Sequence, residues 1–152
     1  MRYAADNYSN GAPRTLTKKL AAGPDTGIKN FTGATGASLD TLVAGWLVAN
    51  YADHNGISGL DPKYQFKSYN LRNVMPRIAQ AVFNSGTATY PLQVRSIGSG
   101  SDNITSKNQT GSGTYYRLNV PANSGAKNVK ILDSAGNLAS FPGAHIYVLR
   151  AQ

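Results

Sequence analysis

The most regular pattern of apolar and polar positions in the chain lies between Ser38 and His54 (SLDTLVAGWLVANYADH). Six apolar side chains follow the 3.6-residue period of a helix there: Leu39, Leu42, Val43, Trp46, Leu47 and Tyr51. Ser38 is a good N-cap, and Asp40 lies where a carboxylate favours the positive end of the helix dipole. The pattern predicts an amphipathic helix that packs through the stripe around Trp46, the only tryptophan of the chain.

The rest of the N-terminal half gives weaker signals. A second helix is predicted from Arg14 to Ala22, where Leu16 and Leu20 lie four residues apart. We expect a loose lead-in over residues 1–13, and a loop or a single helical turn over residues 25–36. The N-terminal half is therefore predicted to be a small helical layer around the central helix.

Near residue 85 the apolar period changes to the alternation that is typical of strands. It predicts strands within residues 90–97, 114–120, 128–133, 138–141 and 144–150. The core of these strands is expected to contain Leu118, Val129, Ile131, Ile146 and Val148. Residues 98–113, rich in Gly, Ser, Asn and Thr, are expected to form a long hairpin loop or a linker. We predict an α+β fold, with a helical region over residues 1–85 and an antiparallel β-sandwich-like domain over residues 86–152.

Composition narrows the classes of function. The 152 residues include no cysteine, and all seven acidic residues are aspartate, so that no glutamate is present. Thiol chemistry, disulfides and every mechanism that needs a glutamate are thereby excluded for this chain. Fifteen lysines and arginines give a net charge of +8, which suits acidic glycans, anionic membranes or nucleic acid.

Location is predicted from composition and from the lack of targeting patterns. The uncharged polar residues are typical of extracellular bacterial proteins. No apolar run reaches the length of a transmembrane helix, and the residues after Met1 lack the apolar core of a signal peptide. We therefore expect an extracellular or cell-surface protein whose export signal, if it has one, lies upstream of Met1.

An oxygen-rich cluster follows the predicted central helix. Asp53, Asn55 and Asp61, in the stretch DHNGISGLD, offer the carboxylate and amide oxygens that calcium prefers. Their spacing is not that of an EF-hand, and a helix-ending turn uses the same residue types. The sequence leaves a calcium site and a turn as two interpretations, and it suggests no other cofactor.

Aromatic and histidine residues suggest three further sites. Tyr115, Tyr116, Arg117 and Tyr147, all in the predicted β domain, would form a platform for a glycan if they shared a face. Basic and aromatic residues interleave over residues 63–69, as in some proteins that bind single-stranded nucleic acid, but half-buried segments show the same alternation. A zinc site would need both histidines and an aspartate, and we favour structural roles for the histidines.

The order of four segments is similar to that in a known family. The segments are PRTLTKKLAAGPDTGIKNFTGATGASLDTLVAGWLVANYADH, GLDPKYQFKSYNLRNVMP, GTYYRLNVP and the closing IYVLRAQ. Over most of residues 12–152, they resemble the C-terminal part of hyicolysin-like secreted bacterial zinc metallopeptidases of the gluzincin type. That family's catalytic HExxH motif and glutamate ligand would lie upstream of residue 1, so the resemblance assigns no catalytic residue here.

The resemblance implies a non-catalytic C-terminal or accessory region of a secreted metallopeptidase-like protein. Such a region would aid folding, substrate positioning or surface attachment, and its partner would be the upstream catalytic domain of the same protein. On its own, the chain is not expected to act as an enzyme. The alternative is a stand-alone extracellular binding or structural module, for a glycan, a cell surface or its own assembly. We favour both over nucleic-acid binding.

Overall fold

The computed structural model describes residues 1–68, 70–83, 92, 94–98, 104–105, 108–109, 111–140 and 142–150. The chain divides into two compact units, a first unit of residues 1–92 with 147–152 and a second unit of residues 93–146. The described helices are α1 (Arg2–Asn7), α2 (Pro13–Ala22), α3 (Gly27–Thr35), α4 (Leu39–Ala52), the 3-10 helix η1 (Pro62–Tyr64) and α5 (Leu71–Phe83). The described strands are β1 (Val94–Ile97) and β2 (Tyr115–Leu118). The predicted domain boundary at residues 85–86 lies outside the described residues.

The two predicted helices are confirmed as α4 and α2. The Thr41 N–H donates a 3.2 Å hydrogen bond to Ser38 Oγ, so Ser38 is the N-cap of α4. This helix ends at Ala52, before the predicted end, and His54 has a positive φ of 50°. α2 begins at Pro13, whose fixed φ and missing N–H suit a first helical position.

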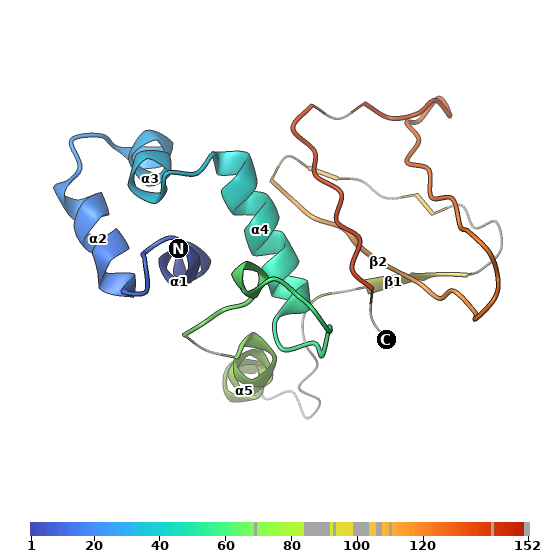
Figure 1. Cartoon of the computed structure of the whole chain (residues 1–152), viewed down its shortest axis with the longest axis horizontal. Helices are drawn as coiled ribbons and strands as arrows, with labels where there is room; N and C mark the ends of the chain where they lie inside the picture. Colours follow the sequence, from blue (N-terminus) through green and yellow to red (C-terminus); the bar gives the residue numbers. More distant parts are fainter. Residues whose placement is uncertain are drawn as a thin grey trace. The chain divides into compact units, whose positions relative to one another are not determined.

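Helices α1 and α3 form where a lead-in and a loop were expected. α1 has only six residues, and it buries Tyr3, Ala4 and Asp6. It lies between α2 and α4, and Figure 1 shows it end-on in this position. Because a helix this short is not stable alone, these tertiary contacts hold it, and the local sequence pattern does not reveal them.

The face that helix α4 buries shares only Leu42 with the predicted apolar stripe. Trp46 is 44% exposed, whereas Gly45, Ala49 and Ala52 are buried. A Cβ atom at position 45 would overlap the hydroxyl of Tyr3, so the glycine allows α1 to approach closely. Small residues therefore decide which side of α4 packs, and the prediction that Trp46 is the centre of the core is wrong.

Two clusters of buried side chains form the core of the first unit. One contains Tyr3, Ala49, Phe66 and Leu71, and the other contains Ala4, Leu16 and Leu42. The ring of Tyr3 meets the rings of Phe66 and Tyr8 edge to face, with centroids 6.1 and 6.2 Å apart. α1 and α4 each contribute to both clusters, and these two helices therefore join them.

The predicted antiparallel β-sandwich is wrong. In the described residues, β1 and β2 pair in parallel, with register from Val94–Tyr115 to Ile97–Leu118. Parallel strands need a connection of about a dozen residues or more, and the stretch expected to be a hairpin loop is long enough for this crossover. Past β2, the described chain has a single antiparallel bridge, between Leu132 and Leu138.

Apolar alternation after β2 does not indicate burial in this structure. Val129 is 67% exposed, and Ile146 is 74% exposed. Ile131 and Val148, also predicted for the core, are exposed as well, and Leu118 is half-buried. The alternation indicates residue types that favour an extended backbone. Burial also requires a second layer of structure that covers one face, and the alternation does not show whether such a layer is present.

Candidate functional site

Asp53 is one of two buried carboxylates that each accept three hydrogen bonds in the first unit. It follows the last residue of α4 and is completely buried. Its Oδ1 accepts hydrogen bonds from the Phe66 N–H at 3.0 Å and from His54 Nδ1 at 2.9 Å. Its Oδ2 accepts from the Leu71 N–H at 2.7 Å. The carboxylate thus ties the end of α4 to the segment of residues 65–71.

The bond to Leu71 also places Asp53 at the start of α5. Leu71 is the first residue of that helix, whose first N–H groups have no acceptor within the helix. A carboxylate there satisfies one such group, and its negative charge faces the positive end of the helix dipole. Asp53 therefore acts as a cap that α4 provides for α5.

The hydrogen bond to Asp53 orients the imidazole ring of His54. Because a carboxylate accepts hydrogen bonds, His54 Nδ1 is the donor in this contact. The positive φ of His54 is a conformation that few residues other than glycine adopt. Part of the His54 ring is exposed, in contrast to the carboxylate that orients it.

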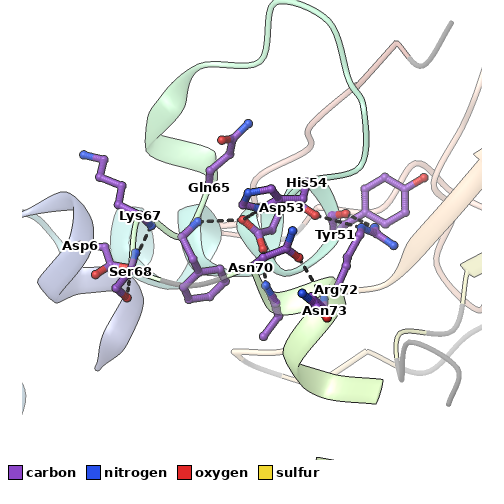
Figure 2. Close-up of polar contacts among 12 residues, drawn as sticks. Asp6, Tyr51, Asp53, His54, Gln65, Lys67, Ser68, Asn70, Arg72 and Asn73 are labelled. Atoms are coloured by element: carbon purple, nitrogen blue, oxygen red, sulfur yellow. Dashed lines mark hydrogen bonds and ion pairs between the residues drawn. The ribbon is translucent and has the colours of Figure 1, made fainter. Parts of the chain in front are cut away.

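Asp6 holds the same segment from the side of α1. Its Oδ2 accepts hydrogen bonds from the N–H groups of Lys67 and Ser68, at 3.0 and 3.1 Å, and from Ser68 Oγ at 2.8 Å. The neighbouring Asn7 donates from Nδ2 to the carbonyl of Gln65 at 3.1 Å. Figure 2 shows Asp6 on one side of the segment and Asp53 on the other.

Arg72 completes the network at the end of α4. Its Nε donates a 2.9 Å hydrogen bond to the carbonyl oxygen of Asp53, and its Nη2 donates to the carbonyl oxygen of Tyr51. The guanidinium also lies 5.9 Å from the centre of the Tyr51 ring. Carbonyls at a helix C-terminus lack partners within the helix and carry partial negative charge, so a cation is favourable there.

A shallow concavity of about 450 Å³ opens beside this network. It is lined by His54, Pro62, Gln65, Phe66, Lys67, Ser68 and Asn70. The imidazole of His54 and the ammonium of Lys67 can both form hydrogen bonds with a bound group. The Ser68 hydroxyl donates its hydrogen bond to Asp6. The concavity can therefore bind a small polar group.

The structure gives protein partners to two of the proposed calcium ligands. Both oxygens of Asp53 accept hydrogen bonds, as described above, while Asp61 accepts from the Lys63 N–H at 3.0 Å and pairs with the Lys63 ammonium at 3.0 Å. These two bonds lower the pKa of Asp61, and the carboxylate raises the pKa of Lys63. Among the described residues, no group of three or more His, Asp, Glu or Cys side chains could hold a metal. A calcium site at Asp53, Asn55 and Asp61 stays a prediction.

The predicted aromatic platform is divided between the two units. Tyr115, Tyr116 and Arg117 are consecutive in β2, so the middle side chain points to the opposite face from the other two. Burial raises the pKa of Tyr115. Tyr147 belongs to the first unit, where its ring meets that of Tyr64 edge to face at 5.7 Å. Burial, and then the nearby Tyr64, raise the pKa of Tyr147.

Other predicted sites fall partly outside what the structure describes. Tyr69, in the basic and aromatic stretch, is one of the residues that it leaves out. His54 and His145 belong to different units. Asp6 was missed by sequence reasoning, and its only local signal is its position three residues after Tyr3, which puts a carboxylate on an apolar helix face.

Comparisons of the chain with profiles of protein families, with curated proteins and with solved structures found no match. None of the described helices is both long enough and apolar enough to cross a membrane. A proposal about function therefore has to draw on the sequence itself and on the chemistry and surroundings of its residues.

Proposed function

We propose that the chain is a non-catalytic accessory region of a secreted metallopeptidase-like protein, and that it aids folding, substrate positioning or surface attachment. The order of the four segments that resemble the C-terminal part of hyicolysin-like peptidases supports this assignment. The observation that carries it is the use of the two buried carboxylates, Asp53 and Asp6, as acceptors for backbone N–H groups.

A catalytic carboxylate has to reach the proton or the atom on which it acts. Asp53 is 0% exposed, and protein donors occupy both of its oxygens. Asp6 is also buried, and its Oδ2 receives three hydrogen bonds from Lys67 and Ser68. Both side chains are thus placed to hold a loop between helices, which is the work of a scaffold.

The charges of the first unit support attachment to a surface. Its five aspartates are Asp6, Asp25, Asp40, Asp53 and Asp61. Two are buried in hydrogen bonds, while Asp25 and Asp61 pair with Lys29 and Lys63 at 2.7 and 3.0 Å. The described cations Arg2, Arg14, Lys18, Lys19, Lys67 and Arg77 are exposed. Most of the accessible charge on this unit is therefore positive.

The intact mass of the native protein, read together with the coding sequence upstream of Met1, tests this proposal. It predicts a longer protein with an HExxH motif before residue 1. A mature protein that starts at Met1, with no peptidase region, would exclude the accessory role. The second candidate, a stand-alone extracellular binding module, would then account for the positive surface, because charge attraction needs no catalytic neighbour.

A further inference from the structure

One face of α2 carries an unusual concentration of exposed cations. Arg14, Lys18 and Lys19 are exposed, whereas Leu16 is buried and Leu20 is half-buried. At 3.6 residues per turn, the three cations lie within about 140° of one another, with Thr15 between them and the leucines on the opposite side. The helix thus packs through its leucines and presents a continuous basic face to solvent.

This arrangement works against the stability of the helix. Arg14 lies in the first turn, where the helix dipole is unfavourable for a cation, and that turn has no acidic residue. Arg14 and Lys18 are four residues apart, so their like charges repel on adjacent turns. Residues that break a local rule without a visible gain in stability are expected at functional positions.

The cations of this face also form no ion pair in the described part of the chain. The ion pairs found there involve Lys29, Lys63 and His54, and none involves a cation of α2. Its charges are consequently available to an external anion, and the guanidinium of Arg14 can bind a carboxylate through two parallel hydrogen bonds.

We infer that the basic face of α2, formed by Arg14, Thr15, Lys18 and Lys19, binds an anionic polysaccharide. This inference rests on the surface-attachment part of the proposed function and names its partner. A charged polysaccharide offers repeated anions to the row of cations, and it offers hydroxyl groups to Thr15. No covalent step is involved, and affinity comes from charge-assisted hydrogen bonds.

Two other classes of anionic partner fit this face less well. A helix that binds a membrane surface inserts an exposed apolar side, but the leucines of α2 point into the protein. Proteins that bind single-stranded nucleic acid stack bases on aromatic side chains, and α2 contains no aromatic residue. A flexible chain of charged sugars requires neither insertion nor stacking.

The test measures binding of the full chain to immobilised alginate, a polysaccharide of uronic acids, at low salt. The test variant is Arg14→Gln/Lys18→Gln/Lys19→Gln, in which glutamine keeps high helix propensity. The control is Lys29→Gln/Lys63→Gln/Arg77→Gln, which lowers the net charge of +8 by the same three charges. Circular dichroism shows whether both variants keep the helical content of the wild type.

We expect the α2 variant to bind alginate at least about tenfold more weakly, because charge-assisted contacts are lost. The control variant should stay within about twofold of the wild type, because it keeps all three cations of the α2 face and loses only the general attraction that depends on total charge. Equal weakening of the two variants would overturn the inference, and so would a wild type that binds no alginate. Tighter binding to duplex DNA or to phosphatidylglycerol vesicles would overturn it in favour of those partners.

These outcomes separate the inference from the proposed function. If alginate binding is absent but the native protein contains an upstream HExxH region, the face of α2 has been misassigned and the accessory role stands. If α2-dependent binding is found in a native protein without a peptidase region, the inference holds and the accessory role fails.

Discussion

The backbone N–H of Leu71 donates a 2.7 Å hydrogen bond to Oδ2 of Asp53, a residue 18 positions earlier in the chain. The bond joins the first residue of α5 to the residue that follows α4. The Phe66 N–H donates to the other carboxylate oxygen, so one buried side chain accepts hydrogen bonds from two backbone donors.

Replacing Asp53 with asparagine tests this role. An asparagine has one acceptor oxygen and one NH₂ group. The backbone N–H of either Phe66 or Leu71 would therefore point at the NH₂ group and lose its acceptor. A buried donor left without an acceptor costs about 1–3 kcal/mol, and the lost charge weakens the remaining bonds. We expect Asp53→Asn to lower the free energy of unfolding by at least this amount, as measured by urea denaturation.

Asp6→Asn is the matched control, since it also neutralises a buried carboxylate. Only Oδ2 of Asp6 accepts hydrogen bonds from described residues, and Oδ1 is buried without such a partner. An asparagine can keep its oxygen at the Oδ2 position, so we expect a smaller loss of stability than for Asp53→Asn. If Asp6→Asn lowers the stability as much as Asp53→Asn or more, the two carboxylates do not differ in their hydrogen bonding as described.

The contact between Tyr3 and Gly45 predicts how a larger residue on α4 is tolerated. Alanine is about 1 kcal/mol more favourable than glycine inside a helix. At position 45, however, its Cβ would overlap the Tyr3 hydroxyl, and such overpacking costs about 1–3 kcal/mol. We expect Gly45→Ala to be destabilising in the wild type, but neutral or stabilising when Tyr3→Phe has removed the hydroxyl.

Gly33→Ala is the control for this pair, because a Cβ at position 33 of α3 would meet no atom within 4 Å. It should raise the stability by about 0.5–1 kcal/mol in either background, as a change of helix propensity alone. If Gly45→Ala behaves like Gly33→Ala in the wild type, α1 does not approach α4 as described.

Trp46 offers a direct probe of which face of α4 is packed. It is the only tryptophan, and 44% of its surface is exposed. We expect its fluorescence to be readily quenched by acrylamide in the native state, because the quencher must reach the ring. Emission that resists acrylamide until the protein is denatured would show that Trp46 is buried, as the apolar stripe had predicted.

Tyr3 predicts a loss of stability at alkaline pH. Burial, with a further contribution from Tyr8, raises the pKa of Tyr3 well above its ordinary value of 10.0. The unfolded chain therefore loses this proton at a lower pH than the folded chain, so the stabilising contribution is complete below about pH 10 and is lost as the pH rises through the folded-state value. The free energy of unfolding should be measured at about pH 8 and at about pH 11. Its decrease between these two pH values should be larger for the wild type than for Tyr3→Phe. Equal decreases would contradict the burial of the Tyr3 hydroxyl.

The existence of α4 could be predicted from the sequence, but its buried face could not. The apolar period and Ser38 are local signals, and both agree with the observed helix. Which side packs depends on Gly45 meeting Tyr3, 42 residues away in sequence, through the short helix α1. A periodic pattern gives the larger side chains more weight, whereas close packing of two helices selects the smaller ones.

Asp53 was identified from the sequence as a candidate, but its partners were not. A carboxylate after a helix suits both a metal site and a turn, and the two differ only in what the oxygens contact. Those contacts come from Phe66 and Leu71, which have no polar side chain to reveal them. Every residue except proline has a backbone N–H, so the residue types do not indicate which N–H groups a carboxylate will bind. Asp6 was missed for the same reason.

Parallel pairing of β1 and β2 was beyond the reach of the sequence pattern. Alternation within residues 94–97 and 115–118 indicates extended chain, but it does not indicate the direction of the partner strand. The Gly- and Ser-rich connection is compatible with a hairpin loop and with a crossover alike. Whether two strands pair in parallel or antiparallel depends on the path of the chain that connects them, which the alternation does not show.

Peptide hydrolysis by the purified full chain tests the central claim most directly. The chain is incubated with zinc and a casein substrate, and His54→Ala serves as the matched variant, because His54 is oriented by the carboxylate of Asp53. A non-catalytic accessory region predicts no cleavage above the blank with either protein. Cleavage that remains with the wild type through repeated purification, and that is lost in His54→Ala, would show that the Asp53–His54 pair is catalytic and would contradict the account.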